Sequence, residues 1–339
     1  MQIHITPVHD FEALGRVWRQ LEPQVPGHGF FQSWSWIGCL AAERFPDAVL
    51  LRAETAGRTL GLALFNRRQG RLCLTESGDA ALDAPFIEHN APLAPAAIGD
   101  ALLRAAWRVA GTRRLVLGGV APGRLAAPGG VAWRAQLREA PFVDLDALRA
   151  AGQGPLGLCS ANARQQIRRS DRHYAATGPL RVTCLEDPLA GFEALLPLHE
   201  RSWRARGKPG AFAGTFMPRF HRALIATAGP RGEIELLRIT AGDADVGYLY
   251  NFRHAGRVLA YQSGFDHAAA GRHGKPGLTS HALAIGRAMA RGDAVYDFLA
   301  GADRYKLSLA QAVQPLWWGE LVRPWSLAGL AVRARRMLP

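Results

Sequence analysis

The stretch Leu236–Gly264, LLRITAGDADVGYLYNFRHAGRVLAYQSG, decides the fold, because an earlier stretch repeats its pattern. Leu50–Gly78 reads LLRAETAGRTLGLALFNRRQGRLCLTESG and matches it without a gap at 9 positions. Composition alone would give about two or three matches. Each copy reads as three strands separated by turns rich in Gly and Asp; in the second copy the strands are Glu235–Ile239, Val246–Phe252 and Val258–Gly264. The chain is therefore predicted to contain an internal duplication.

The two copies also have similar flanks. An amphipathic helix is predicted before each copy, and a second helix and a further strand after it; these are 34–44, 97–110 and 114–117 in the first half and 218–228, 279–291 and 294–299 in the second. The pattern breaks at 145–158, around Gly152–Pro155. The sequence predicts a mixed α/β fold of two tandem units, residues 1–150 and 151–325, followed by a basic helix over 326–339.

The composition is that of a folded protein. The chain has 339 residues and a net charge of +13, with 48% hydrophobic and 20% charged residues, which excludes a disordered chain. No apolar run approaches the roughly 20 residues that span a bilayer. The start lacks the basic and apolar segments of a secretory signal. We expect a soluble protein of the cytoplasm.

The positive charge comes almost entirely from arginine, since the only lysines are Lys208, Lys275 and Lys306. Arginines scattered through a chain rich in Ala, Gly and Pro are typical of a GC-rich genome, and they also leave room for an anionic ligand. No RNA-binding signature accompanies them, so nucleic acid is not expected as a partner.

Motifs for metal and serine-nucleophile chemistry are missing. The four cysteines (39, 73, 159 and 184) are far apart, and the chain has no HExxH, GxSxG or Walker-type loop. We therefore expect neither a metal site nor a disulfide framework.

The two copies differ in the loop that follows the third strand. The second copy has GRHGKPGLT at Gly271–Thr279, leading into a helix, whereas the first has the acidic GDAALDAPFIE at Gly78–Glu88. Free backbone N–H groups and the helix dipole favour an anion at a basic, glycine-rich helix start. The predicted anion-binding residues are Arg272, His273, Gly274, Lys275, Gly277, Leu278 and Thr279. An ordinary surface turn is the alternative.

The second half resembles a known family. The order of three strands, a basic Gly loop, a helix and a strand resembles GNAT acyltransferases. The more detailed likeness is to CelD-type acetyltransferases of cellulose and exopolysaccharide biosynthesis, which are related to Fem-type aminoacyltransferases. It rests on NARQQIRR (162–169), LHERSW (198–203), YQSGFD (261–266), KPG (275–277), YDFLAG (296–301) and Tyr305-Lys306.

This resemblance implies two tandem GNAT-like domains, with the working site in the second. It implies acetyl-CoA or another acyl-CoA as co-substrate, its diphosphate held by the loop before the long helix. The usual Arg/Gln-x-x-Gly-x-Gly/Ala signature is absent, and its nearest match is RHGKPG at 272–277. Fem-type relatives use aminoacyl-tRNA, so that donor, with tRNA as a partner, is the alternative.

Acyl transfer to an amine needs an anchored donor, a polarised carbonyl, a base for the amine and an acid for the leaving thiolate. By resemblance, Tyr305 is the acid, with a packed aromatic as the alternative. Asp297 lies mid-strand between apolar neighbours, where a carboxylate is either functional or a structural hub. His199 or Glu200 would be the base, unless they are a core-edge histidine and a solvated glutamate.

Further residues are candidates for the substrate. Trp203 shares a helix face with His199, and Tyr261 and Gln262 lie on the central strand, where Tyr261 could equally be core. Arg169, adjacent to the row that Arg164, Arg168 and Arg172 form on one helix face, could meet an anionic group or simply be solvated. Lys306 could pair with a phosphate or with Asp297, or be an exposed helix lysine. The tail helix could touch an anionic membrane or pack against the protein.

The sequence therefore predicts an acyl-CoA-dependent acyltransferase acting on an amine, for example an amino sugar or an envelope or exopolysaccharide precursor, or on a sugar hydroxyl. A Fem-like aminoacyltransferase and a non-catalytic GNAT-fold binding module are the alternatives.

Overall fold

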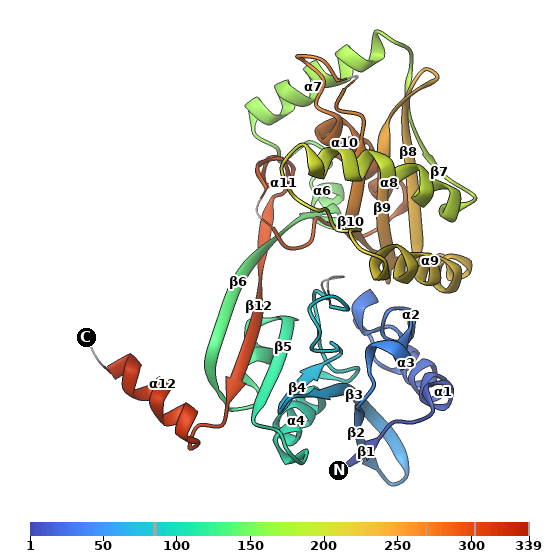
Figure 1. The fold of residues 1–339 in the computed structure, drawn as a ribbon. Coiled ribbons are helices and arrows are strands. Elements are labelled where there is room, and N and C mark those ends of the chain that lie inside the picture. Colours follow the sequence, from blue (N-terminus) through green and yellow to red (C-terminus); the bar gives the residue numbers. More distant parts are fainter. Residues whose placement is uncertain (84–86, 269, 302, 338–339) are drawn as a thin grey trace. The chain divides into compact units, whose positions relative to one another are not determined.

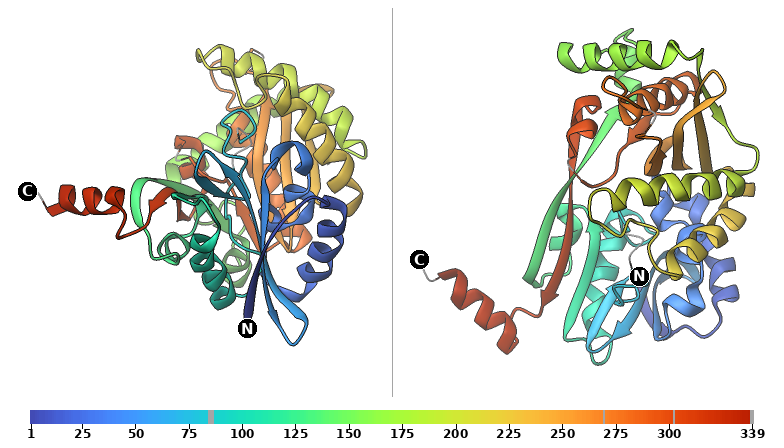
Figure 2. Two further views of the ribbon diagram at one scale, coloured as in Figure 1. Left: turned by 60° about the horizontal axis from the view of Figure 1, so that its bottom comes forward. Right: turned by 45° about the horizontal axis from the view of Figure 1, so that its top comes forward.

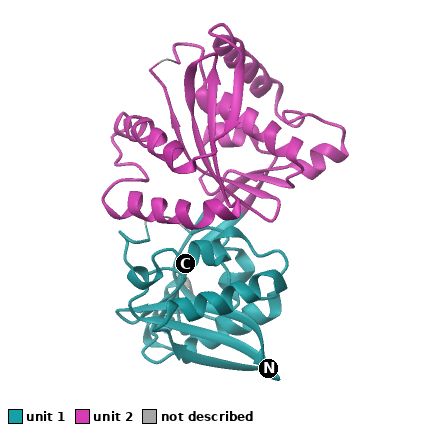
Figure 3. Cartoon of the chain, turned by 90° about the vertical axis from the view of Figure 1, so that its right-hand side faces the viewer, with its two compact units in different colours: residues 1–138, 315–339 teal, residues 139–314 magenta. Residues whose placement is uncertain are grey.

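The computed structural model describes residues 1–83, 87–268, 270–301 and 303–337 (Figure 1). The chain forms two compact units, coloured separately in Figure 3. The first unit comprises residues 1–138 and 315–339, and the second comprises residues 139–314.

The first half of the chain contributes six strands and several short helices among its described residues. In chain order these are β1 (Gln2–Pro7), α1 (Phe11–Leu21), η1 (Glu22–Gln24), η2 (Phe30–Gln32), α2 (Trp34–Ile37), α3 (Ala41–Arg44), β2 (Ala48–Thr55), β3 (Arg58–Arg68), β4 (Arg71–Leu74), α4 (Ala96–Ala105), η3 (Ala106–Arg108), β5 (Arg114–Val120), α5 (Pro122–Ala126) and β6 (Val131–Asp144).

The second half has longer helices. Its elements are α6 (Leu145–Ala150), α7 (Ala161–Ala175), β7 (Leu180–Cys184), α8 (Pro188–Arg204), α9 (Phe216–Ala228), η4 (Gly229–Arg231), β8 (Ile234–Ala241), β9 (Ala244–His254), β10 (Arg257–Phe265), α10 (Pro276–Arg291), β11 (Val295–Asp297), α11 (Arg304–Leu309), β12 (Ala312–Val322) and α12 (Leu327–Met337).

The structure confirms the duplication. A shift of 186 residues carries both ends of β2 and β3 onto the ends of β8 and β9. It also carries the irregularity after Ala53 onto the one after Ile239. In the first unit β4 pairs with β5 in parallel, Arg71 opposite Arg114, and in the second unit β10 pairs with β11 in parallel, Arg257 opposite Val295. The two units are copies of one mixed α/β fold.

Each unit completes its sheet with a strand from the other half of the sequence. In the first unit the strand order is β1-β2-β3-β4-β5-β12, and in the second it is β6-β11-β10-β9-β8-β7. The antiparallel neighbour of β5 is β12, and that of β11 is β6. A shift of 181 residues carries Arg114 onto Val295 and Val131 onto Ala312, so β6 and β12 are equivalent strands that have exchanged places.

The exchange gives unit boundaries that differ from the expected 150/151 and 325/326. The first unit ends at Arg138 and resumes at Pro315, because residues 142–144 of β6 pair with β11 and residues 317–322 of β12 pair with β5. Local sequence patterns carry no information about which strand a given strand will pair with. The tail helix forms as α12; Leu338 and Pro339 lie outside the described residues.

The expected helix over 34–44 is wrong as one element. It divides into α2 and α3, because Leu40 has a left-handed backbone with φ of 50° and Gly38 packs against the Trp34 ring. In the second half, α9 runs unbroken over the corresponding segment.

Each unit has its own apolar core. Leu51, Phe65 and Leu102 are fully buried in the first, and Leu237, Leu249 and Ile285 in the second. Buried residues on both faces of β3 and β9 explain their long apolar runs.

Candidate functional site

The parallel pair in the second unit opens toward its carboxyl end. β10 and β11 pair from Arg257 to Leu259, where Leu259 lies opposite Asp297. β11 ends there, while β10 passes an irregularity between Ala260 and Gln262 and continues to Phe265. This arrangement leaves backbone amides of β10 without a β11 partner, as carbonyl polarisation requires.

The start of α10 is fixed by a chain of hydrogen bonds to α7. The Lys275 amide donates to Ser170 Oγ at 2.8 Å, and the Ser170 and Thr279 hydroxyls are 2.8 Å apart. Thr279 Oγ1 in turn donates to Asp171 Oδ1 at 2.8 Å. Ser170 and Thr279 are fully buried, so the beginning of the helix is held rigidly.

The loop before α10 needs glycine at 274. A Cβ there would overlap the carbonyl oxygen of Ala270, to which the Gly274 amide donates at 2.9 Å. The loop is therefore folded tightly back on itself, and this positions the first turn of α10.

The predicted anion-binding residues lie in the loop before α10 and in its first turn. Among the described residues, the Gly277 and Leu278 amides in the first turn of α10 have no hydrogen-bond partner. Arg272 and Lys275 are exposed. His273 Nε2 lies 3.1 Å from Arg169 Nη2, which brings α7 and the loop together. Asp171 opposes an anion here, although burial raises the pKa of its carboxyl.

An aromatic cluster lies between α10, β11 and α11. The Tyr305 ring stacks on the His281 ring, with centroids 5.4 Å apart and planes at 21°. Phe298 packs edge-on against both rings. His281 Nδ1 lies 2.9 Å from the Tyr296 hydroxyl, while His281 Nε2 is buried with no partner in the described structure.

His281 and Tyr305 stay neutral near pH 7. Burial lowers the pKa of His281 to about 3, with a smaller contribution from the nearby Lys306 charge. Burial, followed by the Asp303 charge, raises the pKa of Tyr305 above its ordinary value. No described residue bonds to the Tyr305 hydroxyl, so it keeps its proton available for a ligand.

Asp297 and Lys306 are occupied by structural contacts. Asp297 is buried; its Oδ2 accepts from Arg257 Nη1 at 2.6 Å and its Oδ1 from the Leu299 amide at 2.8 Å. The Lys306 ammonium donates to the carbonyls of Phe298 and Ala300 at 2.8 and 3.1 Å. For Asp297, these contacts favour the role of a structural hub over acid–base chemistry. For Lys306, they favour an anchor of the loop after β11 over phosphate binding.

His199 and Glu200, the two predicted bases, both have hydrogen-bond partners within the protein. His199 is buried, and its Nε2 accepts from the Ala211 amide at 3.1 Å. Its Nδ1 therefore carries the proton, which it donates to the Ser263 carbonyl at 2.9 Å. Burial lowers the pKa of the ring. Glu200 is exposed and pairs with Arg204 at 2.6 Å.

Of the predicted substrate residues, Trp203 and Tyr261 contact rings outside the Tyr305 cluster. Trp203 packs on His199, with centroids 5.6 Å apart. Tyr261 stacks on Phe252 at 4.6 Å, and its hydroxyl lies 3.3 Å from Nε2 of the buried His221, whose pKa burial lowers to about 3. Gln262 follows the irregularity in β10 and is half-buried.

In the first unit, a segment of the chain occupies the opening of the parallel pair. The Asn90 amide donates to the Gly119 carbonyl at 2.9 Å, and Asn90 bridges Val120 in parallel. The Asn90 side chain also accepts from Thr75 Oγ1 at 2.8 Å and donates to the Leu74 carbonyl at 3.1 Å. The chain itself thus fills the gap between β4 and β5.

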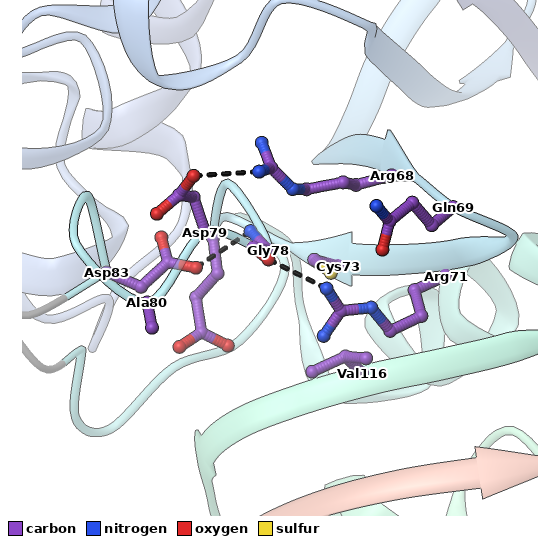
Figure 4. Close-up of a pocket in the computed structure, with 10 residues that line it drawn as sticks. Arg68, Gln69, Arg71, Cys73, Gly78, Asp79, Ala80, Asp83 and Val116 are labelled. Carbon is purple, nitrogen blue, oxygen red and sulfur yellow. Dashed lines mark hydrogen bonds and ion pairs between the residues drawn. The ribbon is translucent and has the colours of Figure 1, made fainter.

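The acidic loop of the first unit bonds to its own amides (Figure 4). The Asp83 carboxylate accepts from the Ser77 and Gly78 amides at 2.7 Å each, and Asp79 pairs with Arg68 at 2.8 Å. Residues 84–86 of this predicted loop lie outside the described residues. An aspartate therefore takes the place that an external anion would need.

A cavity of about 410 Å³ lies beside this loop, lined by Arg68, Arg71, Cys73, Glu76, Asp79 and Asp83 among others. Burial, with a smaller effect of Asp83, raises the pKa of Glu76 to about 8. Burial is also the main reason that the pKa of the Cys73 thiol is raised to about 12. Both groups are neutral near pH 7.

Sequence reasoning missed three residues of the second unit: His281, Ser170 and Asp171. His281 could have been found from its position one turn into the helix that follows the basic loop. Ser170 and Asp171 carry no such signal, since only the packing of α7 against α10 brings them to the loop. No cluster of His, Cys, Asp or Glu suited to a metal ion forms within the described ranges.

Comparison with known proteins is consistent with this fold. Residues 161–307 match the family model of the acetyltransferase (GNAT) domain. The crystal structure of FemX superposes with a TM-score of 0.62 at 10% identity, covering 98% of this chain and 99% of that chain. The C-terminal domain (DUF2156) of a putative lysylphosphatidylglycerol synthetase from Agrobacterium fabrum superposes with a TM-score of 0.57 at 13% identity, covering 97% of each chain. The sequence matches no curated protein.

At these identities the similarity concerns the fold. The GNAT match runs from the start of α7 into α11 and therefore includes the loop at 271–275 and the aromatic cluster. With the duplication, it shows that the chain has a mixed α/β fold of two tandem GNAT-like units. In the described part of the chain, no helix is both long and apolar enough to cross a bilayer.

Proposed function

We propose that the protein is an acyltransferase that takes an acyl group from acyl-CoA and delivers it to an amine, using the second unit. The observation that carries this proposal is the difference between the two copies. The first copy fills its strand opening with Asn90 and its loop amides with Asp83. The second copy has an equivalent strand opening and a basic loop at the start of a 16-residue helix.

The residues at the start of α10 suit the diphosphate of coenzyme A. The Gly277 and Leu278 amides and the helix dipole offer an anion-binding position, and Arg272 and Lys275 add positive charge. Ser170 and Thr279 hold this turn in place without occupying those two amides. Bound there, acyl-CoA would supply an activated thioester carbonyl.

The other parts of the reaction fall to the strand opening and to Tyr305. A β10 amide beyond Leu259 would polarise the thioester carbonyl. Tyr305, which stays protonated near pH 7, would give its hydroxyl proton to the leaving thiolate, and the resulting tyrosinate would take up the proton that the acceptor amine loses. Asp297 and Lys306 would hold the loop after β11 around this position.

For the acceptor we propose an amino sugar or another precursor of an envelope or exopolysaccharide, by the resemblance to CelD-type enzymes. The resemblance rests on YQSGFD (261–266), KPG (275–277) and YDFLAG (296–301), all of which lie in the second unit.

A Fem-like aminoacyltransferase is the second candidate. The observation that favours it is the similarity to FemX over nearly the whole of both chains. Both candidates place acyl transfer in the second unit and differ in the donor. A binding module without catalysis is the third outcome that an experiment must distinguish.

Thermal unfolding in the presence of each donor distinguishes these three. A ligand at a hundred times its Kd stabilises the folded protein by about 2.7 kcal/mol. We expect this shift with acetyl-CoA. Lys275→Glu should abolish it by placing a negative charge at the start of α10, while Lys208→Glu, another exposed lysine of the second unit, should retain it.

A shift with aminoacyl-tRNA alone would replace the proposal by the Fem-like alternative. No shift with either donor, together with no release of free thiol from acetyl-CoA, would favour a binding module. A shift that survives Lys275→Glu would refute the assignment of the loop.

A further inference from the structure

The C-terminal helix presents its apolar side to solvent. Leu327 is 88% exposed and Leu330 45% exposed, and Ala331 and Ala334 are also exposed. These four residues follow the spacing i, i+3, i+4, i+7, so they form one continuous stripe along α12. In Figures 1 and 2, α12 extends from the end of β12, apart from the other helices of its unit.

An exposed tryptophan adds to this stripe. Trp325, just before α12, is 78% exposed. The Arg333 guanidinium lies 4.6 Å from the centroid of its ring and holds the indole against the helix. Tryptophan is enriched where proteins meet the headgroup region of a membrane.

The charged residues of this C-terminal segment are all arginines. Residues 321–339 contain four arginines (323, 333, 335 and 336) and no acidic residue. On a helical wheel, positions 333 and 335 fall on opposite sides of the Leu327–Ala334 stripe. Apolar residues flanked by arginine are typical of helices that lie in the plane of an anionic membrane surface.

The helix is attached firmly to its unit. Ser326 caps its start, since Ser326 Oγ accepts from the Gly329 amide at 3.1 Å. Arg323 donates to the Trp107 carbonyl and covers the Trp107 ring. The segment between β12 and α12 is thus held in place by these contacts, while the apolar side of α12 stays exposed.

We propose that α12 with Trp325 is a docking surface for an anionic phospholipid bilayer. The apolar stripe would enter the headgroup boundary, and the arginines would lie among the lipid phosphates. This inference is independent of the acyl donor and would bring the acyltransferase to a membrane surface.

Co-sedimentation of the full chain with lipid vesicles tests it. We expect binding to vesicles of phosphatidylcholine mixed with phosphatidylglycerol, little binding to phosphatidylcholine alone, and weakening by salt. The double variant Leu327→Ser/Leu330→Ser should lower the partition coefficient about tenfold or more, because two exposed leucines no longer enter the bilayer. Arg333→Ala/Arg335→Ala should remove most of the dependence on anionic lipid and salt.

The matched control is Leu137→Ser/Leu189→Ser, which changes two leucines of 49% and 41% exposure elsewhere on the surface and should bind normally. Equal binding to neutral and anionic vesicles, or equal loss in the control, would overturn the proposal. The proposal would also be overturned if the protein did not bind vesicles but associated with itself, and the α12 variants abolished that self-association. The acetyl-CoA shift should survive in every variant, which separates this test from that of the acyl donor.

Discussion

Tyr305 is the side chain on which the proposed chemistry depends most. Its ring stacks on His281. Within the described part of that cluster, two polar groups have no hydrogen-bond partner, the Tyr305 hydroxyl and His281 Nε2. Tyr305→Phe keeps the stacking and removes the proton. We expect kcat to fall about a hundredfold, with little change in the KM for acyl-CoA.

The matched control is Tyr174→Phe, which removes a buried hydroxyl of the same unit that has no hydrogen-bond partner among the described residues. Its kcat should be close to that of the parent protein. A parental kcat for Tyr305→Phe would reduce Tyr305 to a packing role.

The burial of Glu76 predicts that the stability of the protein depends on pH. Its pKa of about 8 lies above its ordinary value of 4.5, so the folded state holds a proton that the unfolded state releases. The contribution to stability is complete below about pH 4.5 and is lost as pH rises through about 8. Glu76→Gln should therefore unfold like the parent protein at low pH and be more stable by roughly 1–3 kcal/mol at alkaline pH.

Thermal unfolding across the pH range measures this. Asp146→Asn, at an exposed position on α6, is a control that should leave the pH dependence unchanged. A constant difference between Glu76→Gln and the parent at all pH values would show that the carboxyl does not titrate with folding.

The third strand, the loop after it and the following helix are arranged differently in the two copies. Strand, loop and helix occur in both, but in the first copy Asn90 joins the strand opening and α4 begins only at Ala96. In the second copy, Lys275 leads directly into α10, and the Ser170–Thr279 pair fixes that junction. The short basic loop thus leaves the first amides of α10 open, whereas the longer acidic loop bonds to its own amides.

The strand exchange makes the two units depend on each other. A chain cut between residues 150 and 151 gives a first fragment without β12 and a second without β6. In the intact chain, the strand that covers the edge of β5 or β11 lies in the other fragment, so each fragment alone exposes that edge. We expect each to be insoluble or unfolded alone, and the two to recover a soluble complex when coexpressed.

Co-purification through a tag on one fragment, with circular dichroism of the complex, measures this. A second cut, at the turn Ala255-Gly256, would separate β9 from β10 within one sheet. Fragments from this cut should form less soluble complex than fragments from the cut at 150/151. Two stable, separately folded fragments from the first cut would show that the exchanged strands are dispensable.

The sequence by itself determined the duplication, the run of three strands, a helix and a strand in each repeat, and the charge contrast between the two loops. These depend on side-chain periodicity and on Gly and Asp at turns, which act locally. Only the tertiary structure decided the exchange of β6 and β12, the occupation of Asp297, Lys306 and His199 by structural bonds, and the meeting of Ser170 and His281 with the site. Those outcomes depend on which segments distant in the chain come into contact, and no local pattern encodes such contacts.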